Sequence, residues 1–197
     1  MDKVEFKPGN MLYPLPVVMV SVQGEDEKPN IITVAWAGTV CTNPPMLSIS
    51  VRKERYSYHL IKESGEFVVN LTTKNLVKAT DFCGVKSGRD IDKFKAAGLT
   101  MLPSKVVKTP GIAESPVNIE CKVKKIEELG SHHMFIAEVV NVTVDSALMD
   151  ENNTFHLNDA GLITYSHGKY FTLGKQVGSF GFSVRKKKPS KKKKKKK

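Results

Sequence analysis

The sequence predicts a mainly β fold with a few short helices, most simply a β-barrel with helical insertions. Two observations lead to this prediction. The apolar runs are short, rich in Val and Ile, and separated by turn-forming residues. The helical signals are fewer and brief, and no internal repeat is present. At 197 residues the chain is long enough for one domain with a hydrophobic core and short for two.

Seven segments have the pattern of β-strands. The first ends at the polar stretch Gln23 to Asn30, and the third follows the turn sequence Asn43-Pro44-Pro45. The fifth alternates in part, so Val117, Ile119 and Cys121 share one face. The predicted strands are Leu15 to Val22, Ile31 to Ala35, Met46 to Val51, Glu66 to Leu71, Val117 to Ile126, His133 to Val144 and Lys169 to Leu173.

Three segments have helical spacing of apolar residues followed by a glycine, which is a common helix end. Ser57 to Ser64 begins with a serine and stops before Gly65. Asn75 to Phe82 stops at Gly84, and Asp92 to Ala97 is closed by Gly98. We therefore expect three short helices between the strands.

The net charge of +11 lies entirely in the last residues. Residues 185–197 hold eleven of the 31 basic residues and no acidic one, which leaves 20 basic against 20 acidic residues in 1–184. We expect one domain over 1–184 and a disordered poly-lysine tail over 185–197, because a lysine run repels itself and buries no apolar surface. Such a tail could bind nucleic acid or an anionic surface. A solubilising extension is the favoured interpretation, because the body continues no basic stripe.

Metal and hydrolytic chemistry are disfavoured. The three cysteines stand far apart, which argues against structural zinc and for a reducing, cytoplasmic environment. His132 and His133 are adjacent, and we expect them in a loop or at the surface. The glycine patterns of dinucleotide-binding and phosphate-binding loops, the serine-hydrolase elbow and the zinc-protease motif are all absent. No apolar run reaches the length of a membrane span, and the N-terminus lacks a secretory signal.

Two neighbouring segments could hold a ligand. Small residues surround Trp36 between Thr33 and Thr39, and small side chains let a flat ligand reach the backbone N–H and C=O groups. A tightly packed strand crossing with a buried tryptophan would leave the same pattern. Further on, Arg52, Lys53 and Arg55 gather at a predicted helix N-terminus, an arrangement that suits a phosphate. A surface loop in which Ser57 is only an N-cap is the alternative.

Five short sequences in register, together with one later segment, give the chain a resemblance to a known family. They are Pro14-Leu15-Pro16-Val17-Val18, Asn30-Ile31-Ile32-Thr33-Val34-Ala35-Trp36, Asn43-Pro44-Pro45, Arg55-Tyr56-Ser57, Glu66-Phe67-Val68-Val69-Asn70-Leu71 and the segment from Cys83 to Phe94. Together they resemble the flavin-reductase-like proteins, and within that family the flavoredoxins. The similarity covers about residues 10–180.

The resemblance implies an FMN-binding split barrel that works as a homodimer, with FMN near the subunit interface. It implies that a ring-facing segment, Thr33, Val34, Ala35, Trp36 and Ala37, lines the flavin. It also implies that a phosphate-facing set surrounds the phosphate and ribityl chain: Ser50, Arg52, Arg55 and Ser57. A loop from Cys83 to Lys93 would lie near the ring, with Ser87 and Lys93 as polar contacts. Lys93 is a candidate for the positive charge near the N1/C2 edge.

The implied activity is that of an oxidoreductase in which NAD(P)H reduces the flavin and the flavin passes electrons to a small-molecule or protein acceptor. An electron carrier that never meets NAD(P)H is the alternative within flavoproteins. Binding of nucleic acid or an anionic surface through the lysine tail is the alternative of another class. Cys83 could be a redox thiol, although a lone cysteine is more often a small buried hydrophobe. Tyr165, His167 and Tyr170 could stack near a ligand or pack in the core.

Overall fold

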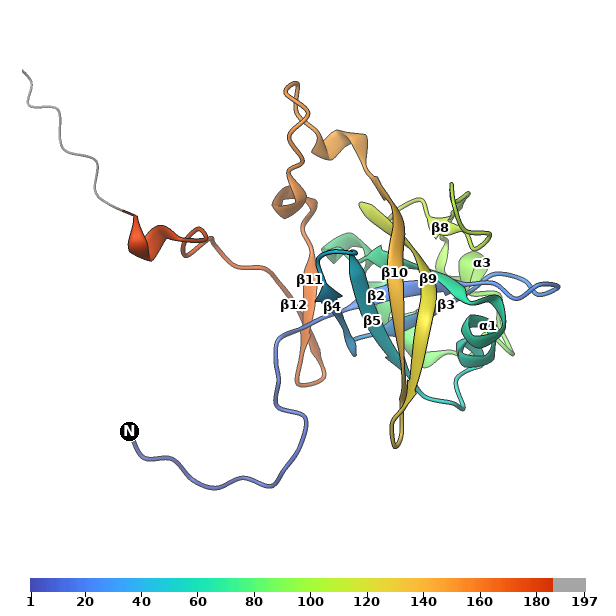
Figure 1. Ribbon diagram of the computed structural model, residues 1–197, viewed down its shortest axis with the longest axis horizontal. Helices are drawn as coiled ribbons and strands as arrows, with labels where there is room; N and C mark the ends of the chain where they lie inside the picture. The colour runs from blue at the N-terminus through green and yellow to red at the C-terminus, as the bar shows by residue number, and fades with distance from the viewer. Residues whose placement is uncertain (186–197) are drawn as a thin grey trace, which may run out of the picture.

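The computed structural model describes residues 1–185. Its body is a seven-stranded antiparallel sheet that curls around a core, in the order β3-β2-β6-β9-β10-β5-β4 (Figure 1). The strands are β2 (Val18–Val22), β3 (Asn30–Val34), β4 (Ala37–Cys41), β5 (Met46–Val51), β6 (Glu66–Leu71), β9 (Val117–Glu128) and β10 (His133–Val144). Beta-branched residues dominate β2 and β3, as expected for buried strands.

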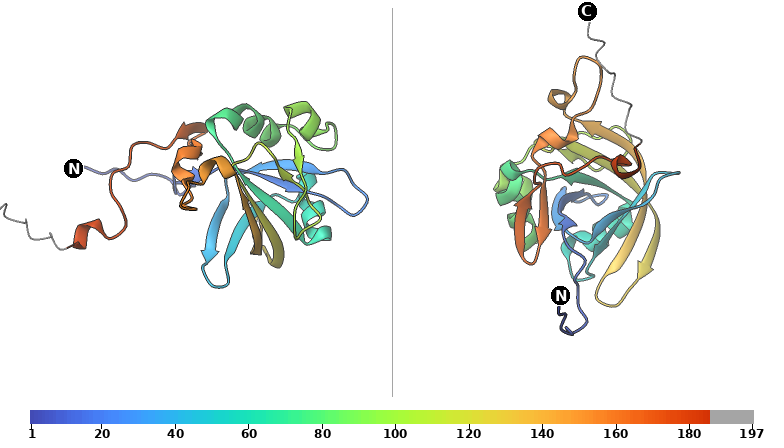
Figure 2. Two further views of the ribbon diagram at one scale, coloured as in Figure 1. Left: turned by 90° about the horizontal axis from the view of Figure 1, so that it is seen from above. Right: turned by 90° about the vertical axis from the view of Figure 1, so that its left-hand side faces the viewer.

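Two small sheets and three α-helices complete the described fold. The sheets are β1 (Leu15–Pro16) with β11 (Ile163–Ser166) and β12 (Lys169–Thr172), and β7 (Met101–Leu102) with β8 (Gly111–Ile112). The helices are α1 (Tyr56–Ser64), α2 (Val77–Val85) and α3 (Lys93–Ala97); Figure 2 shows α2 and α3 together on one side of the sheet and α1 apart from them. Short 3₁₀ turns occupy 74–76, 146–148, 157–160 and 182–184. Within residues 1–185, no helix is long and apolar enough to cross a membrane.

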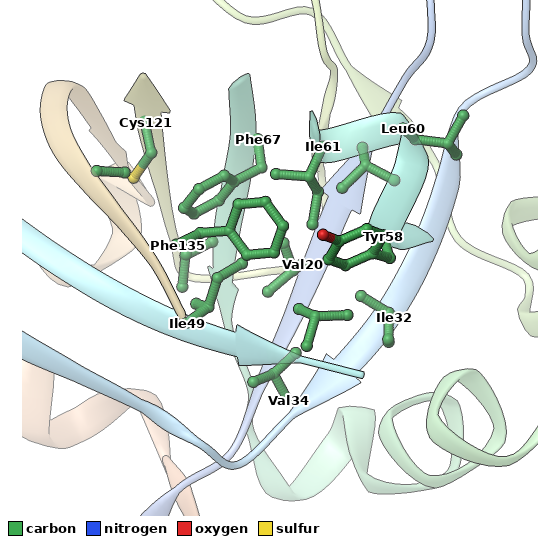
Figure 3. Close-up of a cluster of buried hydrophobic side chains, with 14 of the residues drawn as sticks. Val20, Ile32, Val34, Ile49, Tyr58, Leu60, Ile61, Phe67, Cys121 and Phe135 are labelled. Carbon is green, nitrogen blue, oxygen red and sulfur yellow. The ribbon is translucent and has the colours of Figure 1, made fainter. Parts of the chain in front are cut away.

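At β2 and β3, apolar side chains cover both faces of the curled sheet. Because successive residues of a strand point to opposite faces, Val20 faces the inside of the curl and Met19 the outside. The inner cluster includes Phe67 and Phe135, both fully buried, and α1 closes it with Tyr58, Leu60 and Ile61 (Figure 3). The outer cluster joins β2 and β3 to α2 and α3. Packing on both faces therefore fixes β3 between the barrel core and α2.

Most predicted elements are confirmed, and three of the strands have the predicted bounds. Four strands were missed: β4, whose small residues pair with β5, the two short strands β7 and β8, and β11. The predicted end of the second helix at Gly84 was wrong, because α2 continues to Val85. The glycine at position 84 fits a close approach of α2 to β3, since an added Cβ would be 3.2 Å from the Thr33 Cβ.

Two further predictions need correction or qualification. His133 is not at the surface: it is 3% exposed in β10, and its Nδ1 lies 2.8 Å from the Tyr58 hydroxyl. The proposed tail over 185–197 falls, except for Arg185, outside the described residues, and its disorder and the domain boundary at 184 stay predictions. The mainly β fold class with short helices is confirmed.

Candidate functional site

Two cavities lie next to each other beside β3. The first, of about 290 Å³, is lined by the ends of β3 and β5, by α2 and by the small sheet. The second, of about 270 Å³, is lined by the start of α1, the end of α2 and the segment that leads to α3. Ile32, Arg52 and Arg55 line both. The two cavities therefore form one site with two compartments that meet at a pair of arginines.

The first cavity is lined by the segment from Thr33 to Trp36 and by aromatic rings. Thr33, Val34 and Ala35 lead into Trp36, whose carbonyl accepts a hydrogen bond of 2.8 Å from the Ser50 N–H. This bond extends the pairing of β4 with β5 and so holds the segment after β3 against β5. Small residues here leave the backbone within reach of a flat ligand.

Aromatic rings form two walls of the first cavity. The Trp36 ring stacks on His132, with centroids 5.9 Å apart and planes inclined by 5°. Burial, with a contribution from Arg52, lowers the pKa of His132, so a neutral imidazole is favoured. On the other wall the Tyr170 hydroxyl donates to Asp81 over 3.0 Å, and burial together with this bond raises the Tyr170 pKa to about 12.

The second cavity is strongly cationic. Five basic side chains line it, against one acidic side chain, Glu54. The basic residues are Arg52, Arg55, Lys86, Arg89 and Lys93. The N-terminus of α1 opens here with Arg55 as N-cap, and no side chain caps it. Positive side chains and a free helix N-terminus together favour an anion.

Ser57 does not cap α1, so the N-cap alternative was wrong. It lies one residue inside the helix, almost fully buried, and its Oγ accepts a hydrogen bond of 2.8 Å from Asn30 Nδ2. This bond connects the start of α1 to the start of β3. Ser57 thus lines the second cavity from a position that the tertiary structure holds in place.

Lys93 is an unusual buried cation. Its side chain is 3% exposed, and its Nζ donates to the carbonyls of Ile31 at 2.7 Å and Cys83 at 2.8 Å. Burial lowers its pKa to about 8. Cys83 is fully buried, and burial raises its pKa to about 11, so its thiol is neutral at pH 7. This favours the interpretation of Cys83 as a buried hydrophobe over that of a redox thiol.

The cavities bring together all but one of the predicted site residues. Thr33, Val34, Ala35, Trp36 and Ser50 line the first cavity, Arg52 and Arg55 line both, and Ser57, Cys83, Ser87 and Lys93 line the second. Ala37 lines neither, because the chain has passed into β4, where Ala37 packs against the inner core.

The structure also places in the cavities residues that the sequence analysis did not predict as site residues. These include Asp81, His132, Asn30 and Tyr56. His132 comes from the β9–β10 hairpin, about eighty residues beyond Arg52. No local signal distinguishes it from a surface histidine, so only the pairing of β10 with β5 brings it to the site.

Comparison with known proteins agrees with the fold. The model of the flavin reductase like domain matches residues 10–174. An uncharacterised protein of Archaeoglobus fulgidus is 38% identical over 161 residues, which cover 82% of this chain and 89% of that protein. The flavoredoxin of Desulfovibrio vulgaris (Miyazaki F) superposes with a TM-score of 0.87 at 30% identity, over 93% of this chain and 100% of its own.

A second flavoredoxin, from Methanosarcina acetivorans, superposes with a TM-score of 0.84 at 27% identity, covering 94% of this chain and 100% of its own. Component B of nitrilotriacetate monooxygenase from Bacillus cereus, at 22% identity, shares the fold with a TM-score of 0.81 and covers 91% and 100% of the two chains. The curled sheet is thus a split barrel. The chain belongs to the flavin reductase like domain family.

Proposed function

We propose that the protein binds FMN, with the isoalloxazine ring in the first cavity and the phosphate in the second. The observation that carries this proposal is the junction of the two compartments at Arg52 and Arg55. FMN has the matching form, a flat ring joined by a short ribityl chain to a dianionic phosphate. The names of similar structures, two flavoredoxins among them, support a flavin as the ligand.

Each compartment offers groups suited to its part of the ligand. Backbone groups from Thr33 to Trp36 would meet the polar edge of the ring, and Trp36 with His132 would bound it on one side. Arg52 and Arg55 would contact the phosphate and ribityl chain, since arginine donates two parallel hydrogen bonds to phosphate oxygens. Lys93, whose Nζ is held by two backbone carbonyls, would supply positive charge to the second cavity.

We further propose that the protein is an oxidoreductase in which NAD(P)H reduces the bound flavin. The flavin supplies the hydride chemistry, so the side chains need only bind and orient the reactants. A catalytic triad or metal is therefore unnecessary. The acceptor of the electrons, a small molecule or a protein, and a cytoplasmic location stay predictions, as does a homodimer with FMN near the subunit interface. Light scattering on the purified protein tests the dimer.

The first experiment is a visible absorption spectrum of the purified chain, before and after addition of FMN. Bound flavin is expected to give a yellow protein with a shifted band near that of free FMN. Arg55→Ala should weaken FMN binding about tenfold or more, because a charged hydrogen bond to phosphate is lost. Lys53→Ala is the matched control, since Lys53 is exposed and lines neither cavity. A colourless protein that takes up no FMN would contradict the proposal.

An electron carrier that does not oxidise NAD(P)H is the second candidate function, and the similarity to two flavoredoxins favours it. Stopped-flow mixing of the FMN-loaded protein with NADH and with NADPH separates the two. Rapid bleaching of the flavin band supports the reductase, and absence of bleaching with both supports the carrier. Binding through the lysine tail is tested by removing residues 185–197, which should abolish binding to nucleic acid and leave FMN binding unchanged.

A further inference from the structure

A carboxylate outside the site holds one wall of the second cavity. Tyr56, the first residue of α1, lines that cavity. Its hydroxyl donates a hydrogen bond to Glu27 Oε2. Glu27 lies in the loop between β2 and β3 and lines neither cavity. The Tyr56 ring is therefore anchored from outside the site.

The same carboxylate also interacts with a second side chain of α1, that of His59. His59 Nε2 lies 3.2 Å from Glu27 Oε1, and its ring meets the Tyr56 ring edge-on at 5.1 Å. Residues three apart on a helix share a face, so Glu27 holds both rings at once. The hydrogen bond from Tyr56, together with His59, lowers the pKa of Glu27, so the carboxylate is ionised at neutral pH. Hydrogen bonds to an ionised acceptor are stronger than neutral ones.

The Tyr56 ring in turn supports the segment between α2 and α3. A Cβ added to Gly88 would be 2.7 Å from Tyr56 Cδ1 and closer still to Asn30 Oδ1, so the backbone at Gly88 rests directly on these two side chains. The Arg89 guanidinium lies 5.8 Å from the centre of the Tyr56 ring, within range of a cation–π interaction. Ser87, Gly88 and Arg89 all line the second cavity. Movement of the ring would therefore displace this segment.

We propose that Glu27 is a positioning residue for phosphate recognition: by fixing Tyr56 it sets the segment Ser87–Arg89 against the second cavity, and so determines the preference for FMN over riboflavin. This inference rests on the proposed FMN site. Riboflavin has the same ring and ribityl chain but no phosphate, so its binding would not depend on the phosphate contacts of the second cavity. A change confined to the phosphate contacts of the second cavity should therefore weaken FMN binding and leave riboflavin binding nearly unchanged.

The test measures the dissociation constants of FMN and riboflavin by quenching of flavin fluorescence. Glu27→Ala should weaken FMN binding about tenfold and riboflavin binding less than twofold. The reason is that the charged hydrogen bond to Tyr56 is lost, and with it the support of the segment Ser87–Arg89. Glu27→Gln should recover most of the FMN affinity, because its amide oxygen still accepts a hydrogen bond from Tyr56. Glu25→Ala is the matched control: it removes an exposed carboxylate from the same loop and should leave both constants unchanged.

Tyr56→Phe provides a second test that keeps the ring and removes only its hydroxyl. It should reproduce the selective loss of FMN affinity, and adding it to Glu27→Ala should produce little further loss, because both break the same hydrogen bond. Equal weakening of FMN and riboflavin, no weakening of either, or additive losses would each overturn the inference. Failure of the unmodified protein to bind FMN would instead refute the proposed site, so the two failures are distinguishable.

Discussion

Under the proposed FMN site, Lys93 is expected to make FMN affinity depend on pH above neutrality. Burial lowers its pKa to about 8, from an ordinary value of 10.5, in the absence of a ligand. A bound phosphate in the second cavity would favour the charged ammonium and raise that pKa. A cation whose pKa rises on binding contributes affinity that is fully present below its ligand-free pKa and is lost as the pH rises through 8.

The size of the effect follows from the two pKa values. Where bound phosphate restores the pKa to 10.5, the affinity falls about eightfold between about pH 7.5 and 9.0, and about 300-fold at most at higher pH. The second ionisation of the phosphate, with a pKa of about 6, is nearly complete before this window. The Cys83 thiol, with a pKa of about 11, ionises above it. Lys93 is therefore the group expected to dominate the change.

The assay is titration of the ligand-free protein with FMN across this pH range, followed by flavin fluorescence. Lys93→Met keeps the buried stem and removes the charge, so its affinity should be lower at pH 7.5 and nearly independent of pH. Lys95→Met is the control, because Lys95 is exposed on the same helix and should keep the slope of the unmodified protein. A flat profile in the unmodified protein, or an unchanged slope in Lys93→Met, would refute the reasoning.

Three further predictions concern packing and stability. Gly88→Ala should weaken FMN binding at least about tenfold in the fluorescence titration, because the new Cβ clashes with Asn30 and Tyr56, whereas Gly130→Ala meets no atom within 4 Å and should have no effect. Phe67→Ala should lower the free energy of unfolding in urea by about 3–5 kcal/mol, since Phe67 is fully buried. Glu120→Gln should lower the free energy of unfolding by about 1–3 kcal/mol in the same assay.

The Glu120 prediction has a pH signature. Burial alone would raise the pKa of its carboxyl, but hydrogen bonds from three backbone N–H groups, Lys105 to Val107, and from Asn141 outweigh burial and hold it below its ordinary value. Stability from this group is present above the pKa of the unfolded chain and is lost as the pH falls through the lower, folded value. Unfolding measured from about pH 6 to 3 should show a smaller loss in Glu120→Gln. Equal losses would contradict this account.

The strand pattern and the family were readable from the sequence because their signals are local. Short apolar runs marked β2, β3 and β6 as strands, and the short sequences around Trp36 and Arg55 are consecutive along the chain. The small, weakly apolar residues of β4 carry no such signal, and that strand is identified only by its pairing with β5. The close contact of Gly84 with Thr33 likewise depends on two distant elements.

For the site, the sequence by itself determined which residues could bind a flat ring and a phosphate, since those capacities belong to side-chain types. Only the tertiary structure decided that Arg52 and Arg55 stand between two cavities, that His132 stacks on Trp36, and that Lys93 is buried against two carbonyls. Glu27 is a further case, because its role depends on contact with a helix about thirty residues away. Burial and long-range contact set pKa values and orientation, and neither is a property of a sequence segment alone.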